Sequence, residues 1–142
     1  MTLIVDASVA IAWFVEEPAT AMAEPLLRNR RLFAPDLIVY EVTNVLWRLA
    51  RTGKIGEEHV ATACRELPHS VAALIPCSVL MGRAYGIARS LDHPAYDCFY
   101  LALAESLQAP LITLDKRLYA RTRNTPWNGL AVMLEDESTL SQ

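Results

Sequence analysis

The sequence contains no apolar run that approaches the roughly 20 residues an α-helix needs to span a bilayer. Its opening residues, Met1 to Asp6, place no basic residue before the apolar stretch and reach an acid at once, unlike a secretory signal peptide. Repeats, low-complexity stretches and long linkers are absent as well. We therefore expect a soluble, cytoplasmic protein that has no contact with membranes.

Cysteine and histidine are scarce, and neither shows the spacing of metal ligands. The sequence has three cysteines, Cys64, Cys77 and Cys98, and three histidines, His59, His69 and His93. The cysteines are odd in number, lack C-x-x-C spacing and lie among apolar residues, which predicts buried free thiols rather than a disulfide or a zinc site. We expect the histidines at the surface or at helix caps.

Positive charge is not in excess. The chain has 13 lysines and arginines against 16 acidic residues, a net charge of −3, which argues mildly against a nucleic-acid-binding protein. Ten of the 13 basic residues nevertheless fall into three groups, Arg28/Arg30/Arg31, Arg48/Arg51/Lys54 and Lys116/Arg117/Arg121/Arg123. Such groups can follow a phosphate backbone or form ordinary solvated faces, and the sequence leaves both interpretations open.

Short apolar runs alternate with stretches of helical spacing along the 142 residues. We expect strands over residues 3–5, 31–33, 72–75, 111–113 and 131–134. We expect helices over residues 8–17, 19–29, 36–53, 57–67, 78–90 and 95–108, the first capped by Ser8 and the fourth ended by Pro68. This alternation predicts an α/β fold, a three-layer α/β/α sandwich around a mostly parallel sheet. Residues 1–134 form its single domain, and 135–142 an exposed acidic tail.

Two acids follow predicted strands. Asp6 comes directly after the first strand, and Asp115 comes two residues after the strand that ends at Thr113. In open parallel sheets, ligands bind beyond the carboxyl ends of the strands, so both acids are placed where a site would form. Each also has a structural interpretation, because either one can cap the helix or turn that follows it.

Two more acids lie on predicted helices, on the side that faces the core. Glu41 falls three residues after Ile38, and Asp97 shares a stripe with Leu101 and Ala104. A carboxylate in such a position costs several kcal/mol unless it is paired or binds a metal. We expect neither acid to have a local ion-pairing partner, although Glu41 can turn towards water and Asp97 can simply favour its helix N-terminus.

An all-carboxylate group without histidine or cysteine suits Mg²⁺ or Mn²⁺. These ions can generate a hydroxide and stabilise the oxygens of a phosphodiester displacement. Three neutral residues are candidates to support the acids: Ser8, Asn44 and Thr113. The pattern therefore favours a metal-dependent nuclease.

The same residues resemble the signature of the PIN-domain family. The matching segments are Asp6-Ala7-Ser8-Val9, Pro35 followed by Glu41 and Asn44, Tyr96-Asp97-Cys98-Phe99-Tyr100-Leu101-Ala102-Leu103-Ala104, and Leu111-Ile112-Thr113-Leu114-Asp115. The resemblance is greatest to VapC-like toxins of toxin–antitoxin systems. It extends from Leu3 to about Tyr119, and the segment that begins at Tyr96 is its most specific part.

The resemblance implies a Rossmann-like PIN fold and a Mg²⁺- or Mn²⁺-dependent endoribonuclease. It assigns Asp6, Glu41, Asp97 and Asp115 as catalytic metal ligands, with Asp115 acting either directly or through water. It also implies a homodimer and a VapB-like antitoxin that occupies the active site. Operator DNA would be bound only through the antitoxin. The RNA target and the number of metal ions stay open.

Two other functions are compatible with an acid after the first strand. An aspartyl-phosphate phosphotransfer domain would use Asp6 as a nucleophile, but a dehalogenase-like site needs a second aspartate where Ser8 stands. Only Lys54 and Lys116 are available as a phosphate-binding lysine. A catalytically inactive PIN-like binding module is the second alternative, and it predicts that Asp6→Asn leaves partner binding unchanged.

Overall fold

The apolar runs of the sequence form one five-stranded sheet in the computed structural model, which describes residues 1–141. The strands are β1 (Thr2–Val5), β2 (Arg31–Pro35), β3 (Ala73–Ile75), β4 (Leu111–Thr113) and β5 (Ala131–Met133). The helices are α1 (Ala7–Phe14), α2 (Thr20–Asn29), α3 (Leu37–Arg51), α4 (Glu57–Ser70), α5 (Cys77–Leu91), α6 (Ala95–Leu107) and α7 (Lys116–Thr122), followed by the 3₁₀-helix η1 (Leu134–Ser141).

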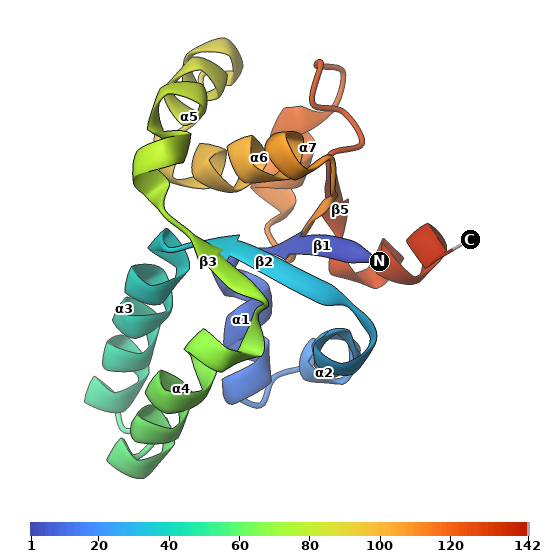
Figure 1. Ribbon diagram of the computed structural model, residues 1–142. Helices are drawn as coiled ribbons and strands as arrows, with labels where there is room; N and C mark the ends of the chain where they lie inside the picture. The colour runs from blue at the N-terminus through green and yellow to red at the C-terminus, as the bar shows by residue number, and fades with distance from the viewer. Residues whose placement is uncertain (142) are drawn as a thin grey trace.

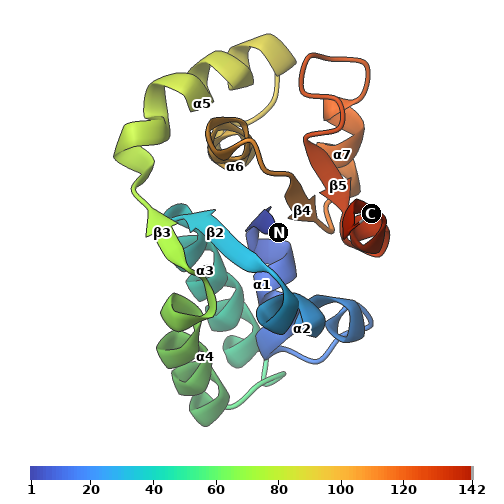
Figure 2. The same cartoon turned by 45° about the vertical axis from the view of Figure 1, so that its right-hand side comes forward.

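All strand pairs of this sheet are parallel, and helices cover both of its faces. Helices α1 to α4 lie on one side, and α5, α6 and α7 lie on the other (Figures 1 and 2). Parallel strands buried on both faces can be apolar throughout, and Leu3, Ile4 and Val5 of β1 are completely buried. The predicted three-layer α/β/α sandwich is therefore confirmed.

The strand order places a crevice beside β1. The strand order is β3-β2-β1-β4-β5. From β1 the chain adds β2 and β3 on one side, and then adds β4 and β5 on the other side of β1. Successive crossovers consequently leave β1 and β4 towards opposite faces of the sheet. Ligand sites in α/β proteins form at this point of reversal, beyond the carboxyl ends of the strands.

Four predicted boundaries were wrong, each for a local reason. Helix α1 ends at Phe14 and not at residue 17, because the backbone is already extended at Val15. Asp6, not Ser8, caps α1, because β1 runs directly into the helix and its side chain accepts a hydrogen bond from the Val9 amide. Helix α4 continues past Pro68 to Ser70. In this final turn the Ser70 hydroxyl donates a hydrogen bond to the Glu66 carbonyl. The stretch after Asp115, treated as a turn, forms the two-turn helix α7.

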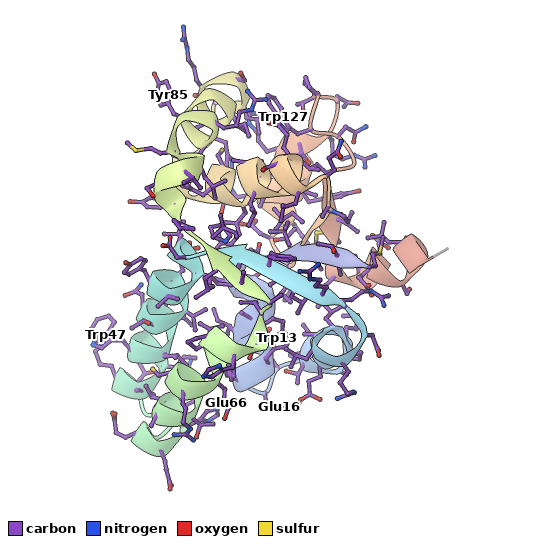
Figure 3. All side chains as sticks on the ribbon, viewed as in Figure 1. Trp13, Glu16, Trp47, Glu66, Tyr85 and Trp127 are labelled. Atoms are coloured by element: carbon purple, nitrogen blue, oxygen red, sulfur yellow. The ribbon has the colours of Figure 1, made fainter. Side chains whose placement is uncertain are left out.

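Helix α6 is the central element of its layer. It is buried along most of its length and lies between the sheet and α5, which packs on its outer side (Figure 2). At the far end of α6, Glu105 accepts two hydrogen bonds from Arg83 of α5, at 2.5 and 2.9 Å. The Trp127 indole donates to the same carboxylate at 3.0 Å, which ties the loop before β5 to this layer (Figure 3).

The C-terminal segment is docked rather than frayed, which corrects the expectation for residues 135–142. Within the described part, Glu135 and Asp136 are exposed as expected, but Glu137 is buried and its Oε1 lies 2.6 Å from Arg30 Nε. The preceding Leu134 is also buried, so the 3₁₀-helix is held by an apolar anchor and an ion pair. Residue 142 lies outside the described residues.

The cysteines are free, as predicted, but only one is fully buried. Cys98 lies in the core, Cys77 is half-buried, and Cys64 is exposed on α4. The burial expected of Cys64 was wrong, because the residue lies at the edge of an apolar pocket, beside Ala63 and Leu67, and stays exposed there. None of the described helices combines the length and apolar character required to cross a membrane.

Candidate metal-binding active site

Four carboxylates from four different elements line one pocket of about 140 Å³ at the carboxyl edge of the sheet. Asp6 follows β1, Asp115 follows β4, Glu41 lies on α3, and Asp97 lies in the first turn of α6. The remaining lining residues are Ala7, Ser8 and Tyr100. The sequence-predicted acids are therefore brought together, although they are separated by up to 109 positions along the chain (115 − 6).

Asp6 is buried at the centre of a hydrogen-bond network. Its Oδ1 accepts from the Ser8 hydroxyl at 2.5 Å and from the Val9 amide at 3.3 Å, and its Oδ2 accepts from the Thr113 hydroxyl. Burial nevertheless dominates and raises the pKa of Asp6 to about 6, with a further contribution from the charge of Asp97. Because burial destabilises its charged form, the Asp6 carboxylate favours binding a proton or a cation.

Ser8 and Thr113 join the ends of β1 and β4. The Ser8 hydroxyl accepts from the Leu114 amide at 3.0 Å while it donates to Asp6. The Thr113 hydroxyl accepts from the Asp115 amide at 3.0 Å and donates to the other oxygen of Asp6. Each hydroxyl therefore fixes the Asp6 carboxylate and the neighbouring strand end together, which is the supporting position suggested by the sequence.

Glu41 is held by a tyrosine that was not predicted from the sequence. The Tyr100 hydroxyl donates to Glu41 Oε1 at 2.6 Å, and its ring is buried in the core. Burial raises the pKa of Glu41, as does the nearby charge of Asp97, and the tyrosine hydrogen bond partly offsets these effects. The available signal was helical spacing, since Tyr100 lies three residues after Asp97 and so faces the same pocket.

Asp97 has a local partner, contrary to expectation. The Nε2 atom of His93, four residues earlier, lies 2.7 Å from Asp97 Oδ2. The histidine side chain is only 8% exposed, so of the two positions expected for the histidines His93 takes the one at a helix N-terminus and not the one at the surface. His93 precedes Pro94, the N-cap of α6, and this turn folds its ring back over the first helical turn. It therefore orients one carboxylate oxygen of the pocket.

Asp115 has two roles in the structure. Its Oδ1 accepts from the amides of Arg117 and Leu118 at 2.9 and 3.2 Å and so caps α7, while the side chain also lines the pocket. Asp115 can therefore cap helix α7 and line the acidic pocket at the same time. Asn44, in contrast, is exposed on α3 and is not among the residues that line the pocket.

The donor set matches a hard divalent cation that keeps much of its own water. Within residues 1–141, no three histidine, cysteine or acidic side chains form a ready-made metal cage. Mg²⁺ does not require one, because it typically binds one or two carboxylates and retains several waters. The charge of Asp97 raises the pKa of both Asp6 and Glu41. The three acids are therefore close enough for one cation to interact with all of them.

The chain has clear relatives among known proteins. It matches the PIN domain over residues 3–124. It is 36% identical over 121 residues to Ribonuclease VapC3 of Pyrobaculum aerophilum, an alignment that covers 83% of this chain and 92% of the relative. A crystal structure of a protein from the same organism has 25% identity and a TM-score of 0.70, with coverage of 100% of this chain and 97% of that one.

A structure with lower identity shows the same fold. In the crystal structure of VapBC2 from Rickettsia felis bound to a DNA fragment from their promoter, the matching chain is 13% identical, with a TM-score of 0.63. The match covers 94% of this chain and 98% of that one.

Proposed function

Because the chain belongs to the PIN-domain family, we propose that it is a Mg²⁺- or Mn²⁺-dependent endoribonuclease and the toxin of a toxin–antitoxin pair. The observation that carries this proposal is the pocket in which four carboxylates converge at the reversal point of a parallel sheet. The 36% identity to a VapC ribonuclease supports RNA as the substrate class.

Asp6, Glu41 and Asp97 would hold the divalent ion, with Asp115 contributing directly or through water. Such an ion would supply an activated water and neutralise charge on the scissile phosphate. The other residues of the pocket keep the acids in place: Ser8 and Thr113 hold Asp6, Tyr100 holds Glu41, and His93 holds Asp97. Every proposed ligand is thereby positioned before substrate arrives.

The partners proposed for the chain follow from its relatives. Structures of VapBC complexes share its fold, which supports a VapB-like antitoxin that covers the acidic pocket. We further propose a homodimer in the cytoplasm, with operator DNA bound only through the antitoxin. The structure of VapBC2 with a promoter fragment is compatible with this arrangement.

The phosphotransfer alternative receives less support from the pocket. Position 8 holds a serine whose hydroxyl donates to Asp6, and not the second aspartate that a dehalogenase-like site needs. No lysine is among the described residues that line the pocket, although this alternative calls for a phosphate-binding lysine. An inactive binding module would have no need for four acids whose mutual repulsion opposes folding.

The direct test is RNA cleavage by the purified chain, freed from any antitoxin. We expect cleavage of single-stranded RNA in Mg²⁺ or Mn²⁺ and none in EDTA, with activity restored when the metal is returned. DNA of the same sequence serves as the control substrate. Absence of cleavage of total cellular RNA in either metal would contradict the proposed function.

Replacing Tyr100 by phenylalanine is expected to weaken the site without breaking it. The change removes a hydrogen bond to Glu41 worth about 1 kcal/mol, so we expect cleavage to fall roughly fivefold and the metal concentration for half-maximal rate to rise. The measurement is the cleavage rate as a function of Mg²⁺ concentration. Tyr40→Phe is a matched control, because Tyr40 precedes Glu41 and is 70% exposed; an equal effect there would contradict the assigned role.

A further inference from the structure

Two adjoining pockets form a groove between the end of α5, its turn into α6, and α7. The larger is about 390 Å³ and the smaller about 300 Å³. Ala120 and Arg121 line both of them, so the two pockets lie side by side. We refer to the combined depression as the α5–α7 groove.

The groove shares walls with the acidic pocket. His93 lines the groove, and its ring contacts Asp97 at 2.7 Å. Arg117 also lines the groove, and its backbone amide donates to Asp115 Oδ1 at 2.9 Å. The groove is therefore the direct neighbour of the acidic pocket.

The charge of the groove is opposite to that of the acidic pocket. Three arginines, Arg117, Arg121 and Arg123, line it against one carboxylate, that of the fully exposed Asp92. Asp92 lies 4.0 Å from Arg121, and an exposed pair at this distance neutralises little of the arginine's charge.

Two of these arginines are held in fixed positions. Arg121 donates through Nε to the Leu91 carbonyl at 2.6 Å, at the end of α5. Arg123 donates to the Tyr119 hydroxyl at 2.8 Å, and its guanidinium lies 5.2 Å from the centre of the tyrosine ring. These contacts use only part of the five N–H donors of each guanidinium, so both groups can still bind an anion.

The other basic groups of the sequence are placed differently. Arg30 pairs with Glu137 beside η1, and Arg51 lies 5.0 Å above the ring of Trp47 on the outer side of α3 (Figure 3). The group in α7 and the residues after it is the one that borders the acidic pocket. Since a net charge of −3 and four clustered acids repel phosphates, substrate binding requires a positive surface close to this pocket.

We propose that single-stranded RNA runs from the acidic pocket into the α5–α7 groove, where Arg117, Arg121 and Arg123 bind the phosphates on one side of the scissile bond. This inference rests on the proposed function, because it locates that substrate. It assigns the three arginines as binding residues and not as catalytic ones. The groove thus compensates the repulsion created by the acids that perform the chemistry.

The test is RNA binding by a chain that cannot cleave. In an Asp6→Asn background, the affinity for a fluorescent single-stranded RNA of about 12 nucleotides is measured by anisotropy between 50 and 200 mM salt. The groove variant is Arg117→Ala with Arg123→Ala, which leaves Arg121 and its contact with α5 intact. The control variant is Arg28→Ala with Arg65→Ala, which removes the same charge from exposed positions on α2 and α4, across the sheet.

We expect the groove variant to lose roughly tenfold in affinity at 100 mM salt. Its slope of log affinity against log salt should be shallower by about 1.4, or about 0.7 for each lost phosphate contact. The control variant should match the parent. In the active chain, the groove changes should raise KM while kcat stays within about twofold.

Equal affinities and slopes for the groove and control variants would overturn the proposal even if the wild-type chain cleaves RNA. A groove variant that binds RNA normally but loses a protein partner would also overturn it, because the groove would then belong to that partner. If the wild-type chain cleaves no RNA in any metal, the proposed function fails, which is a separate result from the binding comparison.

Discussion

Replacing Asp6 by asparagine is expected to reduce RNA cleavage at least a thousandfold while the fold is retained. Asp6 is buried at the end of β1 and lies within the field of Asp97, so its charge would be central to the proposed binding of a cation. Asparagine preserves the shape and can accept the hydrogen bonds of Ser8 and Val9, but it carries no charge. A thousandfold loss corresponds to about 4 kcal/mol of transition-state stabilisation.

The matched control is the same substitution at Asp36. This residue follows β2 at the same edge of the sheet, and its Oδ1 accepts from the Cys77 amide at 3.0 Å, outside the acidic pocket. Asparagine can accept that bond equally well, so we expect nearly full activity. Single-turnover cleavage rates compare the two variants. Residual activity above a tenth in Asp6→Asn, or an equal loss in Asp36→Asn, would contradict the site assignment.

The second large effect is a pH-dependent gain in stability for the same Asp6→Asn variant. The pKa of Asp6 is about 6 in the folded chain against 3.8 as its unperturbed value. Between these pH values the folded state holds a proton that the unfolded state has released, so raising the pH destabilises the fold. About 2 pKa units at about 1.4 kcal/mol each give a penalty of about 3 kcal/mol, complete above roughly pH 6.

Asparagine has no proton to lose and escapes this penalty. In EDTA, we expect the variant and the wild-type chain to be about equally stable at pH 4, and the variant to be more stable by up to about 3 kcal/mol at pH 7.5. Urea unfolding at several pH values measures the difference. Millimolar Mn²⁺ should remove the gap by stabilising only the wild-type chain. A difference in unfolding free energy between the two chains that does not change with pH would contradict a raised pKa of Asp6.

The parts of the fold that were predictable are those with strong periodic signals. Buried parallel strands need unbroken apolar runs, and residues 3–5 and 111–113 have no other simple interpretation. Because parallel strands end at a common edge, the acids that follow these strands were expected to meet, and the structure brings Asp6 and Asp115 into one pocket. Glu41 and Asp97 were identified because helical spacing turns them towards the core.

The missed features depend on side-chain contacts whose partners periodicity alone does not identify, even where helical spacing points a residue towards the pocket. The contact of His93 with Asp97 requires the turn at Pro94, and its spacing alone resembles that of any surface histidine. Tyr100 looks like an ordinary core residue until the position of Glu41, 59 positions earlier, is known. The docking of η1 rests on the pair between Arg30 and Glu137, which is likewise a long-range contact.

The pairing of β1 with β4 also means that the site cannot be completed early in synthesis. The bond from Thr113 to Asp6 joins positions 107 residues apart, and β4 is the partner that places Asp115 beside Asp6. A growing chain that has not passed residue 115 lacks part of the pocket, whatever else has folded. For the proposed ribonuclease, made by ribosomes on messenger RNA, the acidic pocket therefore cannot be complete before residue 115 has been translated.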